Sequence, residues 1–134
     1  MCIMVQKEVG ERLTAKAGHA EFGAISVVLD FYGNVKILRQ VPRHLFVPSP
    51  NVDSCIVQID FVNNKYCANE EMFEKVVRLA FSNRRKTLVN NLCKEFNMSK
   101  ELLGKILQEN GYSATIRGDS LTTDDFVKIT NLLS

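Results

Sequence analysis

The spacing of hydrophobic and polar positions changes about halfway along the 134-residue chain. Up to about residue 63, Val, Ile and Phe gather in short runs that are typical of strands and are interrupted by prolines. After that point, apolar residues recur at every third or fourth position, as on the buried face of a helix. The pattern predicts a strand-rich part over residues 1–63 and a helical part over residues 64–134.

Residues 54–61 carry the clearest strand pattern of the first part. Apolar side chains stand at every second position from Cys55 to Phe61, so we expect them to share one buried face. Residues 34–41 predict a second strand. With the two segments that precede them, these runs predict a sheet of two to four strands.

The segments that precede these strands are less regular. Residues 2–9 form a short apolar run that predicts a buried strand, and residues 9–18 predict a short helix that ends at Gly18. Residues 22–33 fit two structures, because their β-branched content favours a strand whereas their length and the terminal Gly33 favour a buried helix.

The second part predicts a small unit of four helices. Asn69, Ser99 and Thr122 precede three of them and are residue types that accept hydrogen bonds from the first helical turn. Asp125, three residues after Thr122, comes close to completing a capping box. The four predicted helices cover residues 69–81, 84–96, 99–111 and 122–133.

Composition places the chain among ordinary globular proteins and excludes several classes. Apolar residues make up 46% and charged residues 24%, which suffices for a core without staples. The N-terminus turns charged at Lys7, so it predicts neither a signal peptide nor a membrane span. No pair of cysteines forms a C-x-x-C motif, so we expect reduced thiols in a cytosolic protein. The cysteines stand at positions 2, 55, 67 and 93.

The net charge of +2 is unevenly distributed along the chain. Most of the charged residues within 51–74 are acidic, whereas all charged residues within 75–94 are Lys or Arg. A basic block in a near-neutral chain indicates one surface that contacts an anionic partner. Charge alone equally allows a solvated helix face.

The basic block contains Arg84, Arg85 and Lys86 in succession at the predicted start of a helix. Free backbone N–H groups and arginine side chains at such a position would bind an anion such as a phosphate. Asn90 adds a neutral hydrogen-bonding group nearby. The backbone of RNA or DNA is the natural ligand for this pattern.

A proline-bracketed segment, FVPSPNVDS over residues 46–54, precedes the clearest strand. Pro48 and Pro50 fix the backbone in an extended form and remove two hydrogen-bond donors. Such a stiff arm would hold Phe46 in a defined position. The residues alone favour a simpler role, in which Phe46 fills the core and the prolines end a loop.

Motifs of common catalytic sites are missing from the sequence. The glycines are isolated, so no glycine-rich loop is present to hold a phosphate. Neither a G-x-S-x-G elbow nor an H-E-x-x-H motif occurs, and His19 and His44 have no evident partner. Each of the two histidines is therefore more readily explained as a surface residue than as a catalytic base.

Four stretches of the sequence carry a resemblance to a known family. They are MVQKEVGERLTAKAG (4–18), FGAISVVLDFY (22–32), VPRHLFVPSPNVDSCIVQI (41–59) and AFSNRRKTLVNNL (80–92). In this order and spacing they resemble the C-terminal half of the KsgA-type ribosomal RNA small-subunit adenine dimethyltransferases. The resemblance covers the whole chain, and the proline segment and the RRKT run are its most specific parts.

The resemblance implies an α/β fold, with the last strands of a Rossmann-like methyltransferase sheet followed by a small all-α C-terminal domain. Enzymes of this family use S-adenosylmethionine to dimethylate N6 of two adjacent adenines in small-subunit rRNA. The implied partner is this rRNA in the immature small ribosomal subunit. The implied location is the cytoplasm, and the resemblance implies no membrane as a partner.

The resemblance also implies roles for individual residues. Phe46 corresponds to the aromatic that stacks on the target adenine, which must leave its own stack to react. Pro48 and Pro50 correspond to the wall of that pocket. The residues implied to contact RNA are Arg43, Arg84, Arg85, Lys86 and Asn90.

The chain departs from the family in its length. It lacks the glycine-rich cofactor loop, the acidic residue that holds the ribose and the Asn-Leu-Pro-Tyr-type motif. We therefore expect a fragment that binds no S-adenosylmethionine, although the parent enzyme uses it, and that is inactive alone. We also expect that the truncated sheet edge favours self-association.

Two alternatives to this interpretation stay open. The first is a non-enzymatic module that binds rRNA or the ribosome through the basic helical part. The second is a methylase of the antibiotic-resistance branch, which modifies large-subunit rRNA. The RRKT run argues mildly against that second alternative.

Overall fold

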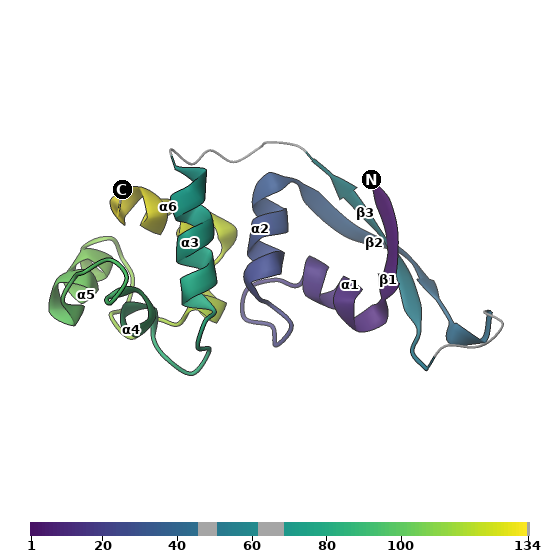
Figure 1. The fold of residues 1–134 in the computed structure, drawn as a ribbon, viewed down its shortest axis with the longest axis horizontal. Coiled ribbons are helices and arrows are strands. Elements are labelled where there is room, and N and C mark those ends of the chain that lie inside the picture. The colour runs from purple at the N-terminus through teal and green to yellow at the C-terminus, as the bar shows by residue number, and fades with distance from the viewer. Residues whose placement is uncertain (46–50, 62–68, 134) are drawn as a thin grey trace. The chain divides into compact units, whose positions relative to one another are not determined.

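A computed structural model describes residues 1–45, 51–61 and 69–133 of the chain. The chain divides into two compact units, Met1–Lys65 (unit 1) and Tyr66–Ser134 (unit 2), as Figure 1 shows. The described residues of unit 1 form strands and helices, whereas those of unit 2 form helices only. The fold is mixed α/β, which confirms the predicted class.

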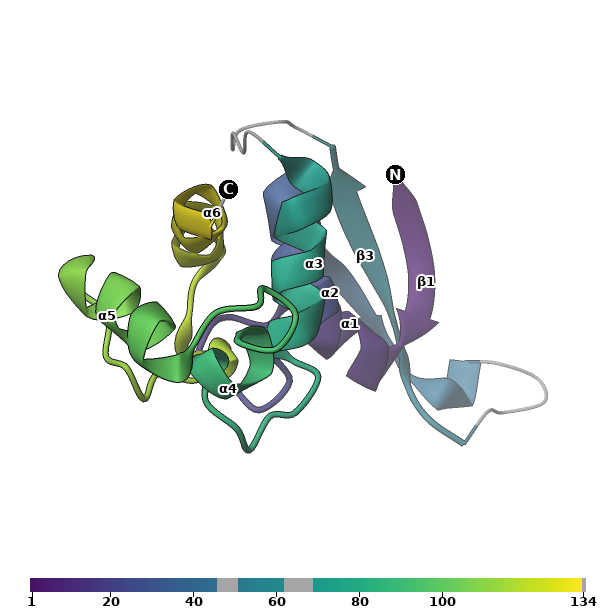
Figure 2. The same ribbon diagram turned by 60° about the vertical axis from the view of Figure 1, so that its left-hand side comes forward.

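The described residues of unit 1 form a three-stranded antiparallel sheet with the strand order β1-β3-β2. Figure 2 shows β1 beside β3. β1 spans Cys2–Gln6, β2 spans Asn34–Val41 and β3 spans Ser54–Asp60. Buried and half-exposed residues alternate along β3, because successive side chains of a strand point to opposite faces. The strands predicted over 34–41 and at Cys55 to Ile59 are therefore confirmed.

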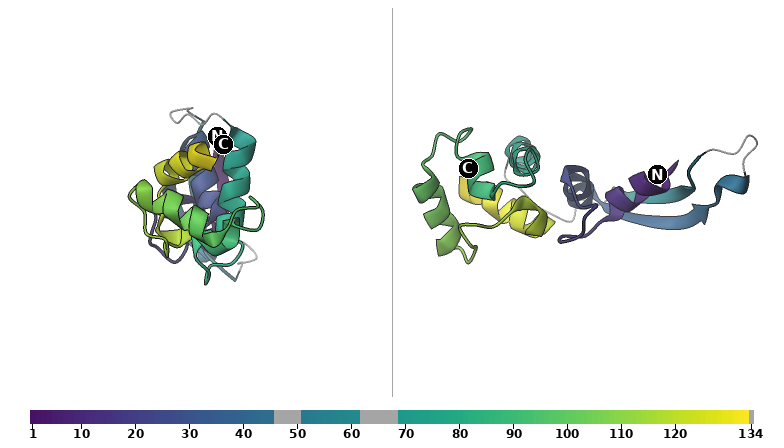
Figure 3. Two further views of the ribbon diagram at one scale, coloured as in Figure 1. Left: turned by 90° about the vertical axis from the view of Figure 1, so that its left-hand side faces the viewer. Right: turned by 90° about the horizontal axis from the view of Figure 1, so that it is seen from below.

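One face of this sheet forms the core of unit 1. Cys55, Val57 and Ile59 of β3 are buried there, and helix α1 (Lys7–Thr14) lies against the sheet (Figure 3). Gly10 of α1 is so close to the Cys55 sulfur that a β-carbon at residue 10 would overlap it. The partly buried residues of the same cluster are Ile3, Val5, Leu13, Val35 and Ile37.

Helix α2 (Ala24–Tyr32) forms the segment for which the sequence fitted either a strand or a helix. Val27 and Phe31 are both buried, and their spacing of four residues places them on one helical face. The Oγ of Ser26 accepts a hydrogen bond from the N–H of Gly23 at 3.2 Å. The same hydroxyl donates to a carbonyl of α1, so this buried polar group is satisfied within the helix pair.

Two expectations about strand burial are wrong. β1 is an edge strand, and Met4 on its uncovered face is 57% exposed, so residues 2–9 do not form a buried strand. Phe61 does not share the buried face of β3, because the strand ends at Asp60 and Phe61 is 62% exposed. Met4 is exposed because it lies on the face of the sheet opposite to Ile3 and Val5, whereas Phe61 is exposed because it lies beyond the end of β3.

The first helix is shorter than the sequence predicts. α1 ends at Thr14, because Ala15 already has an extended backbone. Gly18 adopts φ +89°, which belongs to the following turn. The left-handed conformation explains the glycine, although it does not cap the helix directly.

Unit 2 packs four α-helices around one core. α3 spans Glu70–Ala80, α4 spans Leu88–Leu92, α5 spans Lys100–Glu109 and α6 spans Thr123–Leu133. The predicted number and order of helices are confirmed over the described residues. The largest side chains buried in this core are Phe73, Leu88, Leu92, Leu103, Leu107, Leu121, Phe126 and Ile129.

The predicted helix caps of unit 2 are formed. Asn69 accepts a hydrogen bond from the N–H of Met72 at 3.0 Å, and Ser99 begins α5 in the same way. Thr122 and Asp125 form a reciprocal capping box, with bonds of 3.1 Å and 3.2 Å between side chain and backbone.

The helix predicted over residues 84–96 is much shorter than expected. α4 begins only after Thr87, whose Oγ1 accepts from the N–H of Asn90 at 3.3 Å. Arg84, Arg85 and Lys86 therefore lie in the preceding loop, and the expectation that they mark a helix start is wrong. A threonine N-cap stabilises a helix start through its hydrogen bond to the first turn. Three adjacent cations would destabilise it, because the N-terminal end of a helix is already positive.

Candidate nucleic-acid interface

Residues 81–87 connect α3 to α4, and we call this segment the basic loop. Arg84, Arg85 and Lys86 are all exposed there. The loop folds back on Asn83, whose carbonyl accepts from the N–H of Lys86 at 3.2 Å and whose Oδ1 accepts from the N–H of Arg85 at 3.1 Å. The side chain and carbonyl of one asparagine thus satisfy backbone donors of two of the cationic residues.

Asn91 of α4 fastens the start of the basic loop. Its Nδ2 donates to the carbonyl of Ala80 at 3.2 Å and to the carbonyl of Asn83 at 3.1 Å. The first of these carbonyls lies at the end of α3, where backbone acceptors lack helical partners. One side-chain amide therefore joins the end of α3, the loop and α4.

Arg117 fastens the middle of the same loop from a distant part of the sequence. Its Nε donates to the carbonyl of Arg84 at 3.0 Å, and its Nη2 donates to the same oxygen. A backbone bond of 2.8 Å from Leu88 to the carbonyl of Ile116 holds the two segments together. Sequence reasoning missed Arg117, because only a contact across 33 positions brings it to the basic loop.

Side-chain packing at the end of α3 also supports the basic loop. The rings of Phe81 and Phe126 lie 5.9 Å apart, and Phe126 is fully buried. A β-carbon on Gly118 would lie 3.0 Å from atoms of Ala80, so the short helix η2 (Gly118–Ser120) fits closely against the end of α3. The guanidinium of Arg84 lies 5.7 Å from the centre of the Phe81 ring, within the range of a cation–π contact.

Two cations of the basic loop, Arg85 and Lys86, present their charge at the exposed surface. Among the described residues, no carboxylate forms an ion pair with Arg85 or Lys86. Arg117, which donates to the carbonyl of Arg84, forms a largely exposed ion pair with Asp119 at 4.0 Å. Asn90 is exposed in the first turn of α4, directly after the loop. This surface therefore has the features of an anion-binding site.

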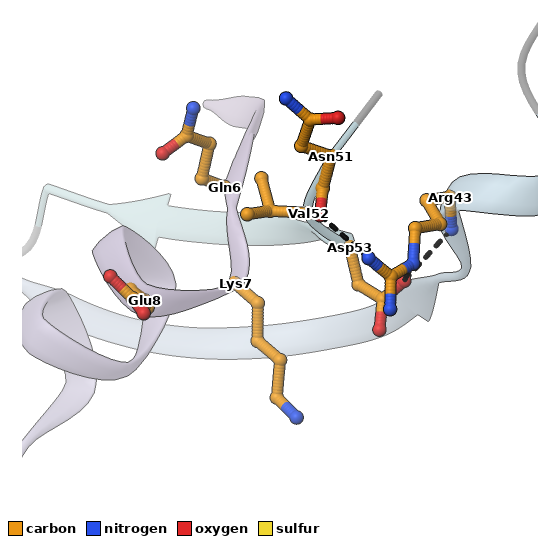
Figure 4. A pocket seen from close by; sticks show the side chains of 7 residues that line it. All are labelled: Gln6, Lys7, Glu8, Arg43, Asn51, Val52 and Asp53. Atoms are coloured by element: carbon orange, nitrogen blue, oxygen red, sulfur yellow. Dashed lines mark hydrogen bonds and ion pairs between the residues drawn. The ribbon is translucent and has the colours of Figure 1, made fainter. Parts of the chain in front are cut away.

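A second candidate region lies in unit 1, at the base of the proline segment. A pocket of about 210 Å³ opens there between the start of α1 and the residues before β3 (Figure 4). Arg43 forms two hydrogen bonds at this pocket. Its backbone N–H donates to the Oδ1 of Asp53 at 2.9 Å, and its side-chain Nη1 donates to the carbonyl of Asn51 at 2.6 Å. The residues that line the pocket are Gln6, Lys7, Glu8, Arg43, Asn51, Val52 and Asp53.

These bonds join the two ends of the segment that carries the predicted stacking residue. The short helix η1 (Arg43–Leu45) precedes that segment, and residues 51–53 follow it. Phe46, Pro48 and Pro50 themselves lie outside the described residues, so their predicted roles stay predictions. The Nε of Arg43 lies 3.7 Å from the Oδ1 of Asp53. Figure 4 shows the two side chains next to each other.

The pocket in unit 1 differs in size and lining from a site for S-adenosylmethionine. The pocket in unit 1 is smaller than the roughly 300–1,000 Å³ of typical small-molecule sites, and charged side chains dominate its lining. Gly10 and Gly118 face side chains or backbone of this chain and leave no cradle for a ligand. Within the described ranges, no cluster of metal-ligating residues forms and no helix is long and apolar enough to cross a membrane.

Comparison with known proteins adds an independent finding. The family model of the ribosomal RNA adenine dimethylases matches residues 1–132. Proteins named ribosomal RNA small subunit methyltransferase A from Bacillus mycoides (strain KBAB4) and Bacillus cereus (strain B4264) are each 42% identical to the chain over 136 residues. The match covers 98% of this chain and 47% of each relative, so the chain spans about half the length of the curated relatives it matches.

Solved structures show the same fold. A dimethyladenosine transferase from Plasmodium falciparum matches with a TM-score of 0.76 at 24% identity, over 96% of this chain and 54% of its own. The 23S rRNA methyltransferase ErmE matches with a TM-score of 0.65 at 17% identity, over 98% of this chain and 53% of its own. Such identities support a common fold and nothing finer.

Proposed function

Because the chain belongs to the ribosomal RNA adenine dimethylase family, we propose that it is the RNA-docking half of an rRNA adenine dimethyltransferase. The complete protein would transfer methyl groups from S-adenosylmethionine to N6 of two adjacent adenines in small-subunit rRNA. The 42% identity to relatives named for the small subunit supports that choice of rRNA.

The observation that carries this proposal is the basic loop. The side chains exposed there are those of Arg84, Arg85 and Lys86. Hydrogen bonds from the backbone of this loop to Asn83, and from Arg117 to its backbone, hold the loop in place. Phosphate contacts from such cations supply much of the affinity of a protein for nucleic acid. We assign the basic loop and Asn90 to contacts with the rRNA backbone, and Arg43 to a contact beside the adenine pocket.

Unit 1 would contribute the wall of that pocket. Phe46 would stack on the extruded adenine, while Pro48 and Pro50 keep its segment stiff. The bonds of Arg43 to Asn51 and Asp53 support this proposal, because they hold the two ends of the segment together. A base stacked on an aromatic ring gains about 1–3 kcal/mol, which offsets part of the cost of its extrusion.

RNA binding by the chain tests the docking role directly. We expect an RNA hairpin from the 3′ region of small-subunit rRNA to bind with an affinity that falls as salt rises. Replacing Arg84, Arg85 and Lys86 by alanine should make the negative slope of log K against log salt less steep by roughly two. The reason is that each phosphate contact contributes about 0.7–0.9 to the magnitude of this slope. An unchanged slope would place the RNA surface elsewhere.

Methyl transfer tests the catalytic half of the proposal. The pocket in unit 1 is small and charged side chains dominate its lining, so we expect the 134-residue chain to leave immature small subunits unmethylated. A full-length relative serves as the positive control in the same assay. Turnover by the chain alone would contradict this assignment.

The basic loop also supports a second candidate function, a module that binds rRNA without catalysing a reaction. Unit 2 presents its cations on a core that needs no cofactor. Competition with a full-length relative for the small subunit separates the two functions. A chain that binds without displacing the methyltransferase would favour the independent module.

Self-association of the chain is a further part of the proposal. β1 pairs with β3 on one side, and its opposite edge carries no strand among the described residues. Exposed edges of this kind pair readily with other chains. We expect a concentration-dependent oligomer in analytical ultracentrifugation, and Met4→Lys should shift it toward the monomer.

A further inference from the structure

The basic loop is held by two side chains that lie outside its run of cations. Asn91 donates to the carbonyls of Ala80 and Asn83, and Arg117 donates twice to the carbonyl of Arg84. Both act on backbone oxygens, so neither bond uses the charged groups of the loop. The cationic side chains therefore stay exposed while their backbone is fixed.

Fixing this backbone matters because the loop brings like charges together. Arg84, Arg85 and Lys86 are adjacent in sequence, and Arg117 adds a guanidinium at the carbonyl of Arg84. Without an anion, such neighbours repel one another, and a free loop would spread them apart. A loop ordered in advance loses less conformational entropy when it binds a polyanion.

We propose that Asn91 and Arg117 are positioning residues of the RNA-contacting surface, which hold the basic loop in its binding conformation. This inference rests on the proposed function, because it assigns the means by which the same surface is ordered. Arg117 could favour RNA binding in two ways, by its hydrogen bonds to the carbonyl of Arg84 and by its positive charge. A lysine at this position keeps the charge but cannot form the same pair of hydrogen bonds.

Arg117→Lys keeps the charge and removes the paired donation to one carbonyl. If Arg117 positions the loop, the variant should bind the rRNA hairpin roughly three- to tenfold more weakly, the range expected for the loss of about one net hydrogen bond. Its salt slope should stay that of the unchanged chain, because the number of charges is the same. Lys105→Ala, which removes an exposed charge on α5, is the matched control for charge in unit 2.

Asn91→Ala tests the other positioning residue by a double-mutant cycle. In the unchanged chain it should weaken binding of the hairpin by a similar factor. In the Arg84→Ala, Arg85→Ala and Lys86→Ala background it should have little further effect on binding, because the loop then has no cations to position. Thermal unfolding of every variant, followed by circular dichroism, shows whether lost binding reflects lost folding.

The possible outcomes distinguish this inference from the proposed function. If the triple alanine variant binds RNA normally, the proposed function fails and the inference fails with it. If that variant loses binding while Arg117→Lys and Asn91→Ala bind normally, the function stands and the positioning role is wrong. The positioning role is also wrong if Asn91→Ala weakens binding equally in both backgrounds. If Asn91→Ala unfolds the chain, Arg117→Lys at its exposed position decides the question.

Discussion

The base of the proline segment in unit 1 and the basic loop in unit 2 use the same bond in different electrostatic surroundings. In each, an arginine donates to a backbone carbonyl: Arg43 to that of Asn51 and Arg117 to that of Arg84. Arg43 has the carboxylate of Asp53 beside it, so its charge is largely compensated. Arg117 has the carboxylate of Asp119 at 4.0 Å, but its guanidinium also lies at the carbonyl of Arg84, in the loop that carries three adjacent cations. The comparison shows the same arginine-to-carbonyl bond at two different places, one beside a pocket and one in a loop of exposed cations.

The largest expected effect comes from removing the support beneath the basic loop. Phe126→Ala should destabilise unit 2 by about 3–5 kcal/mol, as deletion of a buried aromatic ring typically does. RNA binding should fall with it, because Phe81 at the start of the loop packs on this ring. Urea unfolding and hairpin binding measure the two effects. Leu132→Ala, at a partly exposed position of α6, is the control.

A smaller effect is expected from the closest contact in unit 1. Gly10→Ala would place a β-carbon on the sulfur of Cys55 and should destabilise unit 1 by about 1–3 kcal/mol, the usual range for overpacking. Urea unfolding measures the loss. The double variant with Cys55→Ala should be less destabilised than the sum of the single variants. Simple additivity would show that the helix moves away instead.

Removing one acid from each region sharpens the electrostatic comparison. Asp53→Ala should destabilise unit 1 by about 1 kcal/mol, because it removes a hydrogen bond and an exposed ion pair. Asp119→Ala should instead tighten hairpin binding slightly, because it removes the carboxylate near Arg117. Equal effects of the two substitutions on stability and on hairpin binding would contradict these different roles of Asp53 and Asp119.

The smallest expected effect concerns pH and lies away from both regions. Burial, the hydrogen bond from Tyr112 to Asp125 and the charge of Asp125 raise the pKa of Tyr112 from 10.0 to about 12. The folded state therefore keeps a proton that the unfolded chain loses above pH 10. The stability gained from this bond should be complete below that pH and disappear as pH rises through about 12. Tyr112→Phe should remove that part of the pH dependence in thermal unfolding.

At acid pH the same pair acts in the opposite sense. Burial alone would raise the pKa of Asp125, but hydrogen bonds from Thr122 and Tyr112 outweigh it and hold that pKa below its usual value. The stability from the ionised carboxylate is therefore present above the unfolded pKa and is lost as pH falls through the lower folded pKa. Asp125→Asn should flatten thermal stability in this acid range.

The sequence predicted the elements whose cause is local. The caps at Asn69, Ser99 and Thr122 were found because each depends on residues within one helical turn. The alternation from Cys55 to Ile59 was found because one covered face imposes it. The family itself was recognised from four motifs, and the comparisons confirm it.

Features that depend on distant contacts were not predictable. The sequence left residues 22–33 open between strand and helix, since burial against α1 decides the outcome. It placed Phe61 inside, because a strand pattern does not show where its sheet ceases to be covered. It also missed Arg117, which reaches the basic loop only in the folded chain. The predicted stacking role of Phe46 still awaits a test.

The contact between Gly10 and Cys55 also makes unit 1 suitable for thiol labelling. Cys55 is sealed beneath α1, and burial together with the nearby Glu11 carboxylate raises the pKa of its thiol, whereas Cys2 is exposed. A short pulse of an alkylating reagent should therefore modify Cys2 at once and Cys55 only after α1 detaches from the sheet. Mass spectrometry of peptides containing Cys55 would then report the opening rate of this unit under native conditions.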